Sequence, residues 1–249
     1  PFTSHLDELR SRLVKCCVAI GVAFLGCFAI AERIFHLLTA PIRRVDVAGL
    51  TLIGTAVPEA FFPKMKVSFA AALVVALPVL LWHVWQFVAP GLYEHEKRYT
   101  RSFVFFGSLF FLAGTAFCYE VFLQFGLEFL LLRYEAIQVQ PLIQMGEYFS
   151  LVSRLVLAFG VMFQLPVVAY FLSRVGLIDH RFLIRHIRYA AIGIAILAAL
   201  LTPPDLISQV LFMVPLALLY ALSIVVAFFA RQRGESPENP SSRGQPGDL

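Results

Sequence analysis

Residues 67–93 read VSFAAALVVALPVLLWHVWQFVAPGLY and contain no Lys, Arg, Asp or Glu. A helix needs about 20 mainly apolar residues to cross the hydrocarbon core of a bilayer, and this run is longer than that. Six such runs in the chain predict an all-α, polytopic membrane protein with six transmembrane helices in one bundle. The other five occupy residues 16–31, 102–119, 155–173, 189–204 and 206–230.

The composition of the whole chain agrees with a membrane protein. Its 249 residues are 59% hydrophobic and only 14% charged, whereas a soluble domain carries about 25% charged residues. The sequence has no His-Glu-x-x-His motif, Gly-x-Ser-x-Gly elbow or P-loop, so we expect neither an enzyme nor a metal or cofactor site. No basic patch interleaved with aromatics suggests nucleic-acid binding. The cysteines lack metal or disulfide spacing and are expected to be small buried hydrophobes: Cys16, Cys17, Cys27 and Cys118.

The fifth apolar run is unusually short. From residue 187 to 201 a helix would reach only roughly 22 Å, against a bilayer core of about 30 Å. Pro203 and Pro204 then break the helix. The segment is therefore either a re-entrant hairpin or a short span that thins the membrane, and we favour the span because the sixth run is long enough to return.

The distribution of charge predicts the orientation. With six spans and the N-terminus inside, 13 of the 20 Lys and Arg residues lie inside and 7 outside. The positive-inside rule then predicts that both termini are cytoplasmic. Residues 231–249 are rich in Gly, Ser, Pro and Glu and are expected to form a disordered tail after a transmembrane domain of residues 1–230.

Two long connections, residues 32–66 and 120–154, fall on the outer side in this arrangement. They contain apolar residues and prolines, Pro41 among them. We therefore expect them to fold over the bundle as an extracytoplasmic cap, held by a structural ion pair between Glu59 and the lysines that precede the second span, of which Lys66 is one.

Two polar signatures face the same compartment, because two crossings separate them. The first is SHLDELRSRL at residues 4–13. Ser4 is expected to be the N-cap of a helix that continues into the first span. Glu8 can pair with Arg12 at the i,i+4 spacing, and the bland interpretation of Glu8 is a weak surface ion pair.

The second signature is FVAPGLYEHEKR at residues 87–98. Its bland interpretation is a solvated connection with basic anchors after the span. The functional interpretation is that Glu96 binds a guanidinium, because arginine offers paired donors that match a carboxylate and lysine does not. Together the two signatures suggest a site that reads a basic peptide at the membrane face.

Polar residues within the spans are few. Gln164 lies in the middle of the fourth run, where an unpartnered amide is costly. It is either an intramolecular helix–helix hydrogen-bond partner or a polar handle for another transmembrane helix. Thr202 and Gln209 flank the Pro203-Pro204-Asp205 turn and add polarity near the outer ends of their helices.

These residues resemble the TatC family, the receptor subunits of the twin-arginine protein translocase. The resemblance extends to about residue 230. Its motifs are His5-Leu6-x-Glu8-Leu9-Arg10, Phe61 with Lys66, Trp85-x-Phe87-x-x-Pro90-Gly91-Leu92-Tyr93-x-x-Glu96, and Leu201-Thr202-Pro203-Pro204-Asp205 followed by Gln209.

The resemblance implies a curved six-helix bundle with a short fifth and sixth helix, in the cytoplasmic (inner) membrane of a bacterium. It also implies that Glu8 and Glu96 recognise the arginine pair of twin-arginine signal peptides on folded precursors, in a site shaped by Phe87, Arg10 and Arg98. No ATP is required, since the family uses the proton-motive force.

The resemblance further implies single-span partners similar to TatA and TatB, packed where Gln164, Thr202 and Gln209 lie, and self-association in a receptor complex. The family often has glutamate at the position of Gln164, so a role that needs an ionisable group there is in doubt. An ion-coupled transporter of small solutes is the alternative function, but such a protein should carry acids at the membrane midplane.

Overall fold

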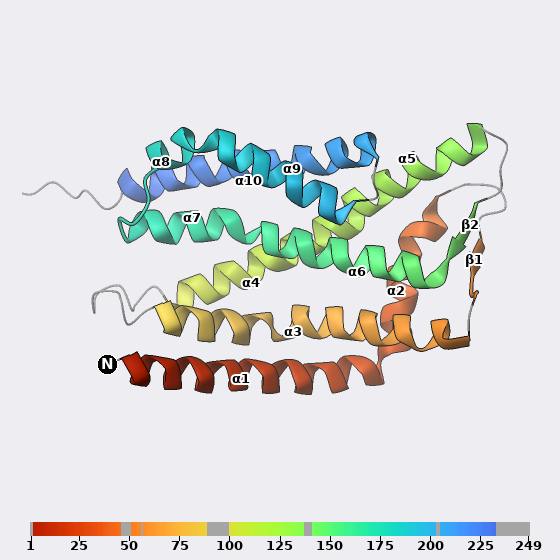
Figure 1. Ribbon diagram of the computed structural model, residues 1–249, viewed down its shortest axis with the longest axis horizontal. Helices are drawn as coiled ribbons and strands as arrows, with labels where there is room; N and C mark the ends of the chain where they lie inside the picture. The colour runs from red at the N-terminus through yellow and green to blue at the C-terminus, as the bar shows by residue number, and fades with distance from the viewer. Residues whose placement is uncertain are drawn as a thin grey trace, which may run out of the picture.

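The protein is a bundle of long helices that run along a common axis (Figure 1). The computed structural model describes residues 2–45, 51–55, 57–88, 100–136, 141–202 and 205–232. In chain order its elements are α1 (Phe2–Ala29), α2 (Ala31–Arg44), β1 (Thr51–Ile53), the 3-10 helix η1 (Val57–Ala60), α3 (Phe62–Val88), α4 (Thr100–Phe117), the π-helical η4 (Cys118–Phe122), α5 (Leu123–Ala136), β2 (Leu142–Gln144), α6 (Met145–Met162), α7 (Gln164–Arg174), α8 (His180–Arg185), α9 (Ile187–Leu201) and α10 (Leu206–Gln232).

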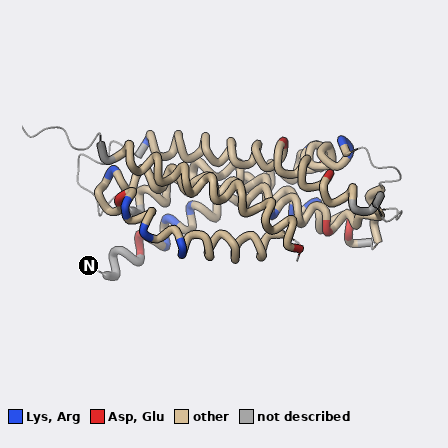
Figure 2. The backbone as a smooth tube through the Cα atoms, turned by 90° about the horizontal axis from the view of Figure 1, so that it is seen from above, with Lys and Arg blue, Asp and Glu red and all other residues tan. Residues whose placement is uncertain are grey.

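Five helical segments are long and apolar enough to cross a membrane, and a sixth apolar helix, Ile187–Leu201, is shorter. This confirms the expectation of an all-helical, polytopic membrane protein. Lys, Arg, Asp and Glu lie mainly toward the two ends of the bundle (Figure 2). The five long segments are Asp7–Ala29, Phe62–Gln86, Arg101–Leu132, Met145–Arg174 and Leu206–Ala230.

Several boundaries differ from those expected. Helix α1 begins at Phe2, so Ser4 lies inside the helix and is not its N-cap. Helices α5 and α6 cover most of residues 120–154, which were expected to be a connection. The sixth helix is not short: α10 has 27 residues and continues through Pro215. Residues 231 and 232 of the expected tail belong to α10, and residues 233–249 lie outside the described residues.

The end of the bundle away from the N-terminus carries a small cap, which we define as α2, β1, η1 and β2 (Figure 1). The cap contains a small sheet that the sequence did not predict, in which β1 and β2 pair in parallel with Leu52 opposite Ile143. Pro41 is buried within α2. The hydroxyl of Tyr148 donates to the carbonyl of Leu38 at 2.8 Å and ties α2 to α6.

Several polar contacts hold the cap, and the ion pair that we expected between Glu59 and the lysines stays a prediction. The Glu59 carboxylate accepts hydrogen bonds from the Thr55 backbone N–H and the Gln144 side-chain amide. Lys64 forms an ion pair with Glu32 at 3.5 Å. The Lys66 ammonium donates to Ser150 Oγ at 2.9 Å. This bond joins α3 to α6, with Lys66 and Ser150 at the same depth.

Small residues let α4 and α6 approach closely. A Cβ atom on Gly160 would lie 2.6 Å from the ring of Phe111, and one on Gly114 would lie 2.7 Å from the carbonyl oxygen of Phe159. Close approach of this kind is typical of helix packing in membranes, where dispersion contacts replace the hydrophobic effect. The ring of Phe159 then contacts that of Phe212 on α10, with 5.0 Å between centroids.

We predict that Gly114→Ala destabilises the bundle by about 1–3 kcal/mol, because its Cβ would meet backbone that cannot turn aside. Gly21→Ala on α1 is the control, since nothing lies within 4 Å of its Cβ position. The control should be neutral or slightly stabilising, as alanine is the better helix former. Thermal unfolding of both variants in detergent measures the difference, and equal midpoints would contradict the packing argument.

Candidate functional site

The candidate site lies where α1 begins and α3 ends. The two helices run antiparallel and side by side, so that the N-terminus and the end of α3 meet at one end of the bundle (Figure 1). The connection from α3 to α4, residues 89–99, leaves from the same end. The first signature and the start of the second are therefore neighbours in space.

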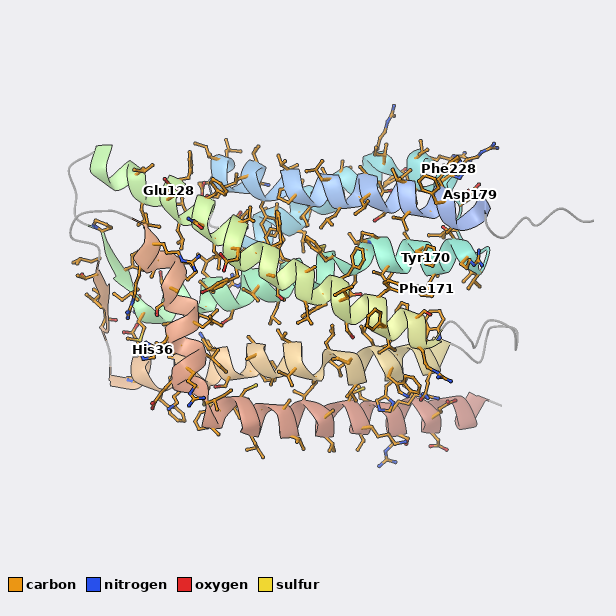
Figure 3. All side chains as sticks on the ribbon, turned by 180° about the vertical axis from the view of Figure 1, so that it is seen from behind. His36, Glu128, Tyr170, Phe171, Asp179 and Phe228 are labelled. Atoms are coloured by element: carbon orange, nitrogen blue, oxygen red, sulfur yellow. The ribbon has the colours of Figure 1, made fainter. Side chains whose placement is uncertain are left out.

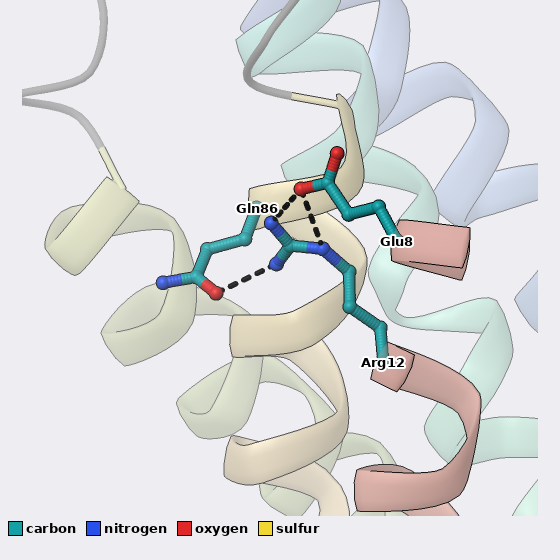
Figure 4. Close-up of polar contacts among 3 residues, drawn as sticks. All are labelled: Glu8, Arg12 and Gln86. Atoms are coloured by element: carbon teal, nitrogen blue, oxygen red, sulfur yellow. Dashed lines mark hydrogen bonds and ion pairs between the residues drawn. The ribbon is translucent and has the colours of Figure 1, made fainter. Parts of the chain in front are cut away.

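A hydrogen-bonded group joins the two helices at this end (Figure 4). The guanidinium of Arg12 binds Glu8 through two of its nitrogens, with Nε 3.1 Å from Oε1. Its third nitrogen donates to Gln86 Oε1 at 2.6 Å. Arg12 thus connects a carboxylate on α1 with an amide two residues before the end of α3.

The Glu8–Arg12 pair is only partly shielded from solvent. The side chain of Glu8 is 38% exposed and that of Arg12 is 18% exposed. A pair of this kind contributes at most about 1 kcal/mol to stability. The i,i+4 ion pair that was the bland interpretation is therefore present, and the carboxylate remains within reach of a ligand.

The end of α3 is held by aromatic packing. Trp85 stacks on Phe103 of α4 with 4.5 Å between ring centroids, and Phe171 of α7 packs edge-on against both rings. Figure 3 shows Phe171 at the same end as Asp179 and Phe228, away from Glu128 and His36. This cluster holds the end of α3 against the start of α4 and against α7.

The remaining residues expected in this site are described only in part. Arg10 is exposed on α1. Phe87 belongs to α3, but its side chain lies outside the description. Glu96 and Arg98 lie outside the described residues altogether. Sequence reasoning missed Gln86, because only the fold brings it to Arg12 across 74 residues of chain.

The polar residues expected to bind partner helices divide into two places. Gln164 begins α7, and its amide nitrogen donates to the Gly107 carbonyl of α4 at 2.8 Å. This is the intramolecular bond that was one of the two alternatives. The amide oxygen is buried and has no hydrogen-bond partner among the described residues. It lies beside α4, 3.3 Å from where a Cβ atom of Gly107 would be.

Thr202 and Gln209 instead serve the end of α9. The hydroxyl of Thr202 donates to the Ala198 carbonyl at 2.8 Å, and the amide of Gln209 donates to the Ala195 carbonyl at 3.2 Å. Asp205 accepts a hydrogen bond from the Ser208 N–H at 2.7 Å and so caps the start of α10. These bonds satisfy backbone groups where one helix ends and the next begins.

The cysteines match their expected role only in part. Cys27 and Cys118 are buried, whereas Cys17 is exposed on α1. Within the described ranges no group of three or more His, Cys, Asp or Glu side chains has the geometry to hold a metal ion.

Comparison with known proteins places the chain in a family. The family model of the Sec-independent protein translocase protein (TatC) matches residues 4–215. The chain belongs to the TatC family. It is 39% identical over 242 residues to TatC of Desulforapulum autotrophicum, which covers 97% of this chain and 89% of that protein.

Other relatives agree. TatC of Campylobacter jejuni is 43% identical over 224 residues, covering 89% of this chain and 91% of that protein. TatC of Escherichia coli K12 is 36% identical over 239 residues, covering 96% and 92%. A crystal structure described as the twin-arginine translocase receptor TatC superposes with a TM-score of 0.83 at 34% identity, covering 91% of this chain and 99% of that one.

This TatC family member is therefore a multi-pass membrane protein and a component of the Sec-independent, or Tat, protein translocase. Its class is protein transport rather than catalysis. A transporter of small solutes, our alternative, is not supported, because every relative named above is a protein translocase subunit.

The bond between Gln164 and Gly107 leads to a testable prediction about a glutamate at position 164. An ionised carboxylate accepts hydrogen bonds but cannot donate to the Gly107 carbonyl. Gln164→Glu should therefore keep the bond only when protonated, and its unfolding temperature should fall from pH 5 to pH 8 relative to wild type. Gln164→Leu is the control and should lose about 0.6–1.7 kcal/mol at either pH. A pH-independent Gln164→Glu variant would contradict this account.

Proposed function

We propose that this protein is the receptor subunit of its translocase and binds the twin-arginine signal peptides of folded precursors at the end where α1 begins. The observation that carries the proposal is the contact of Arg12 with Glu8. The protein's own guanidinium binds that carboxylate through two nitrogens, so the site can accept a guanidinium from a ligand.

The second carboxylate in this proposal is Glu96. Its chain leaves α3 two residues after Gln86, from an end fixed by the Trp85 cluster. Two carboxylates from separate segments would each receive one arginine of the pair, with Arg10, Phe87 and Arg98 around them. Lysine would bind more weakly, because it lacks the planar fork of donors.

The same arrangement requires the site to face the cytoplasm. The end of the bundle that carries it is rich in basic residues, as the positive-inside rule requires of a cytoplasmic face. Exposed arginines without a hydrogen bond or ion pair to any other described residue include Arg181, Arg185 and Arg188. Both termini would then be cytoplasmic in a bacterial inner membrane, and the cap would be extracytoplasmic.

We further propose that single-span subunits similar to TatA and TatB pack against α9 and α10, near Thr202 and Gln209, in a self-associating receptor complex. Both helices present broad apolar faces, with Ile196 of α9 66% exposed and Leu218 of α10 66% exposed. Gln164 contributes by holding α7 to α4. The proton-motive force would drive transport through this assembly.

Selectivity for arginine tests the receptor proposal. Wild-type protein in detergent should bind a twin-arginine signal peptide about tenfold or more tightly than its twin-lysine counterpart, since each charge-assisted bidentate contact is worth more than 1.4 kcal/mol. Glu8→Gln and Glu96→Gln should each lower the ratio toward one. Glu128→Gln, an exposed acid at the opposite end, should leave it unchanged. Equal binding of both peptides to wild type would refute the site.

A separate prediction is that Arg12 competes with the signal peptide for the Glu8 carboxylate. Because Arg12 occupies Glu8 before a peptide arrives, Arg12→Gln should free the carboxylate and strengthen twin-arginine peptide binding by about threefold to tenfold. Lys15→Gln removes an equal, exposed charge one turn away without touching Glu8 and is the control. Peptide titration by fluorescence anisotropy measures both. Weaker binding by Arg12→Gln would instead mean that Arg12 orients Glu8.

A further inference from the structure

An open cavity lies beside the cap, at the opposite end of the bundle from the proposed signal-peptide site, and Thr202 of the proposed partner surface is part of its wall. The cavity measures about 850 Å³, within the range of small-molecule sites. Its walls come from η1, α3, α5, β2, α6 and α9. Two acids and two bases line it together with leucine side chains.

The acidic and basic side chains of the cavity lie at different depths along the bundle axis. Helices α3 and α6 both start at the cap and run parallel, and the bond from Lys66 to Ser150 aligns their depths. Glu59 precedes Lys66 by seven residues, and Glu147 precedes Arg154 by seven. In both cases the carboxylate therefore lies nearer the cap and the cation lies deeper, by about 10 Å along α6.

Apolar side chains line the same cavity alongside the cations. Leu127 and Leu130 of α5 line the same cavity, whose wall is more apolar than polar. From the cap inward, the carboxylates are followed by the cations, and the leucine side chains line the wall beside the cations. A phospholipid with a primary ammonium in its headgroup presents the complementary order, namely ammonium, phosphate and acyl chains.

Two of the charged groups are available for a ligand. Glu147 and Arg154 are exposed, and neither forms a hydrogen bond or ion pair with any residue in the described part of the chain. Arg154 nevertheless lies inside the candidate span Met145–Arg174. An ionisable group at such a position commonly marks a functional site with a partner of opposite charge.

We propose that this cavity binds one phosphatidylethanolamine-type lipid. Arg154 and Lys66 bind the phosphate, and Arg154 reaches it because side chains on α6 lean toward the cap. Glu147 accepts hydrogen bonds from the ammonium, while the leucines of α5 contact an acyl chain. Glu59 is held by Thr55 and Gln144 and adds negative potential at the ammonium layer.

The carboxylates decide between lipid classes. A phosphatidylglycerol headgroup has no ammonium and would bring net negative charge to Glu147 and Glu59, which opposes its binding. A phosphatidylcholine headgroup carries its charge on a trimethylated nitrogen that has no N–H to donate. The cavity should therefore prefer the primary ammonium to either of these lipids.

Native mass spectrometry of the full-length protein in detergent, titrated with each lipid, tests this inference. Wild type should retain phosphatidylethanolamine about tenfold more tightly than phosphatidylglycerol. Glu147→Gln should reduce the preference over phosphatidylcholine, and Arg154→Gln should weaken all three lipids. The exposed side chains of Glu128 and Arg43 lie outside the cavity, so Glu128→Gln and Arg43→Gln are matched controls and should behave as wild type.

Two outcomes would overturn the proposal. One is equal retention of phosphatidylethanolamine by wild type, Glu147→Gln and Arg154→Gln. The other comes from a photo-crosslinker placed at Leu151, which lines the cavity. In native membranes it should yield a lipid adduct, whereas a protein adduct would assign the cavity to a partner's helix. Neither result depends on the signal-peptide site, so failure here would leave the receptor proposal untouched.

Discussion

The hydrocarbon core of a bilayer offers no hydrogen-bond partners, and this constraint shapes the rest of the molecule. Every backbone polar group within the membrane must be satisfied inside its own segment, which leaves helices as the form available to this chain. Side chains that carry charge or form hydrogen bonds therefore lie mainly at the helix ends. The Glu8–Arg12–Gln86 group and the polar cap accordingly lie at opposite ends of the bundle, and nothing of comparable polarity joins the helices between them in the described residues.

Within the bundle, specificity comes from shape. Since lipid tails are as apolar as the side chains, helices associate through close contact rather than through burial from water. The absent side chains of Gly114 and Gly160 admit Phe159 and Phe111, and Phe159 continues to Phe212 on α10. The same logic explains Gln164, whose amide bonds α7 to α4 beside Gly107. One neutral amide fixes the pairing of two helices without placing a charge in the membrane.

The sequence predicted the helices well because charge-free runs are long and unambiguous. It predicted their boundaries poorly where charges enter a span. Arg154 sets the start of the uncharged fourth run at residue 155, although α6 already begins at Met145. The strands β1 and β2 have three residues each and exist only because two distant segments meet. In the site, the i,i+4 spacing predicted Glu8 with Arg12, whereas Gln86 could not be predicted because tertiary packing alone brings it there.

The short helix α9 shows a further effect of the lack of hydrogen-bond partners in the bilayer core. Its 15 residues cover about 22 Å, so the turn to α10 is set back from the cap end of the bundle (Figure 1). The carbonyls that the helix end exposes there are satisfied by Thr202 and Gln209. Thr202 also lines the cavity that contains Lys66 and Arg154. Polar groups therefore reach deeper beside α9 than elsewhere at this end, and a bilayer that adapts to them must thin locally. Thinning next to the surface proposed for partner helices would lower the barrier to moving a folded protein across the membrane without a permanent pore.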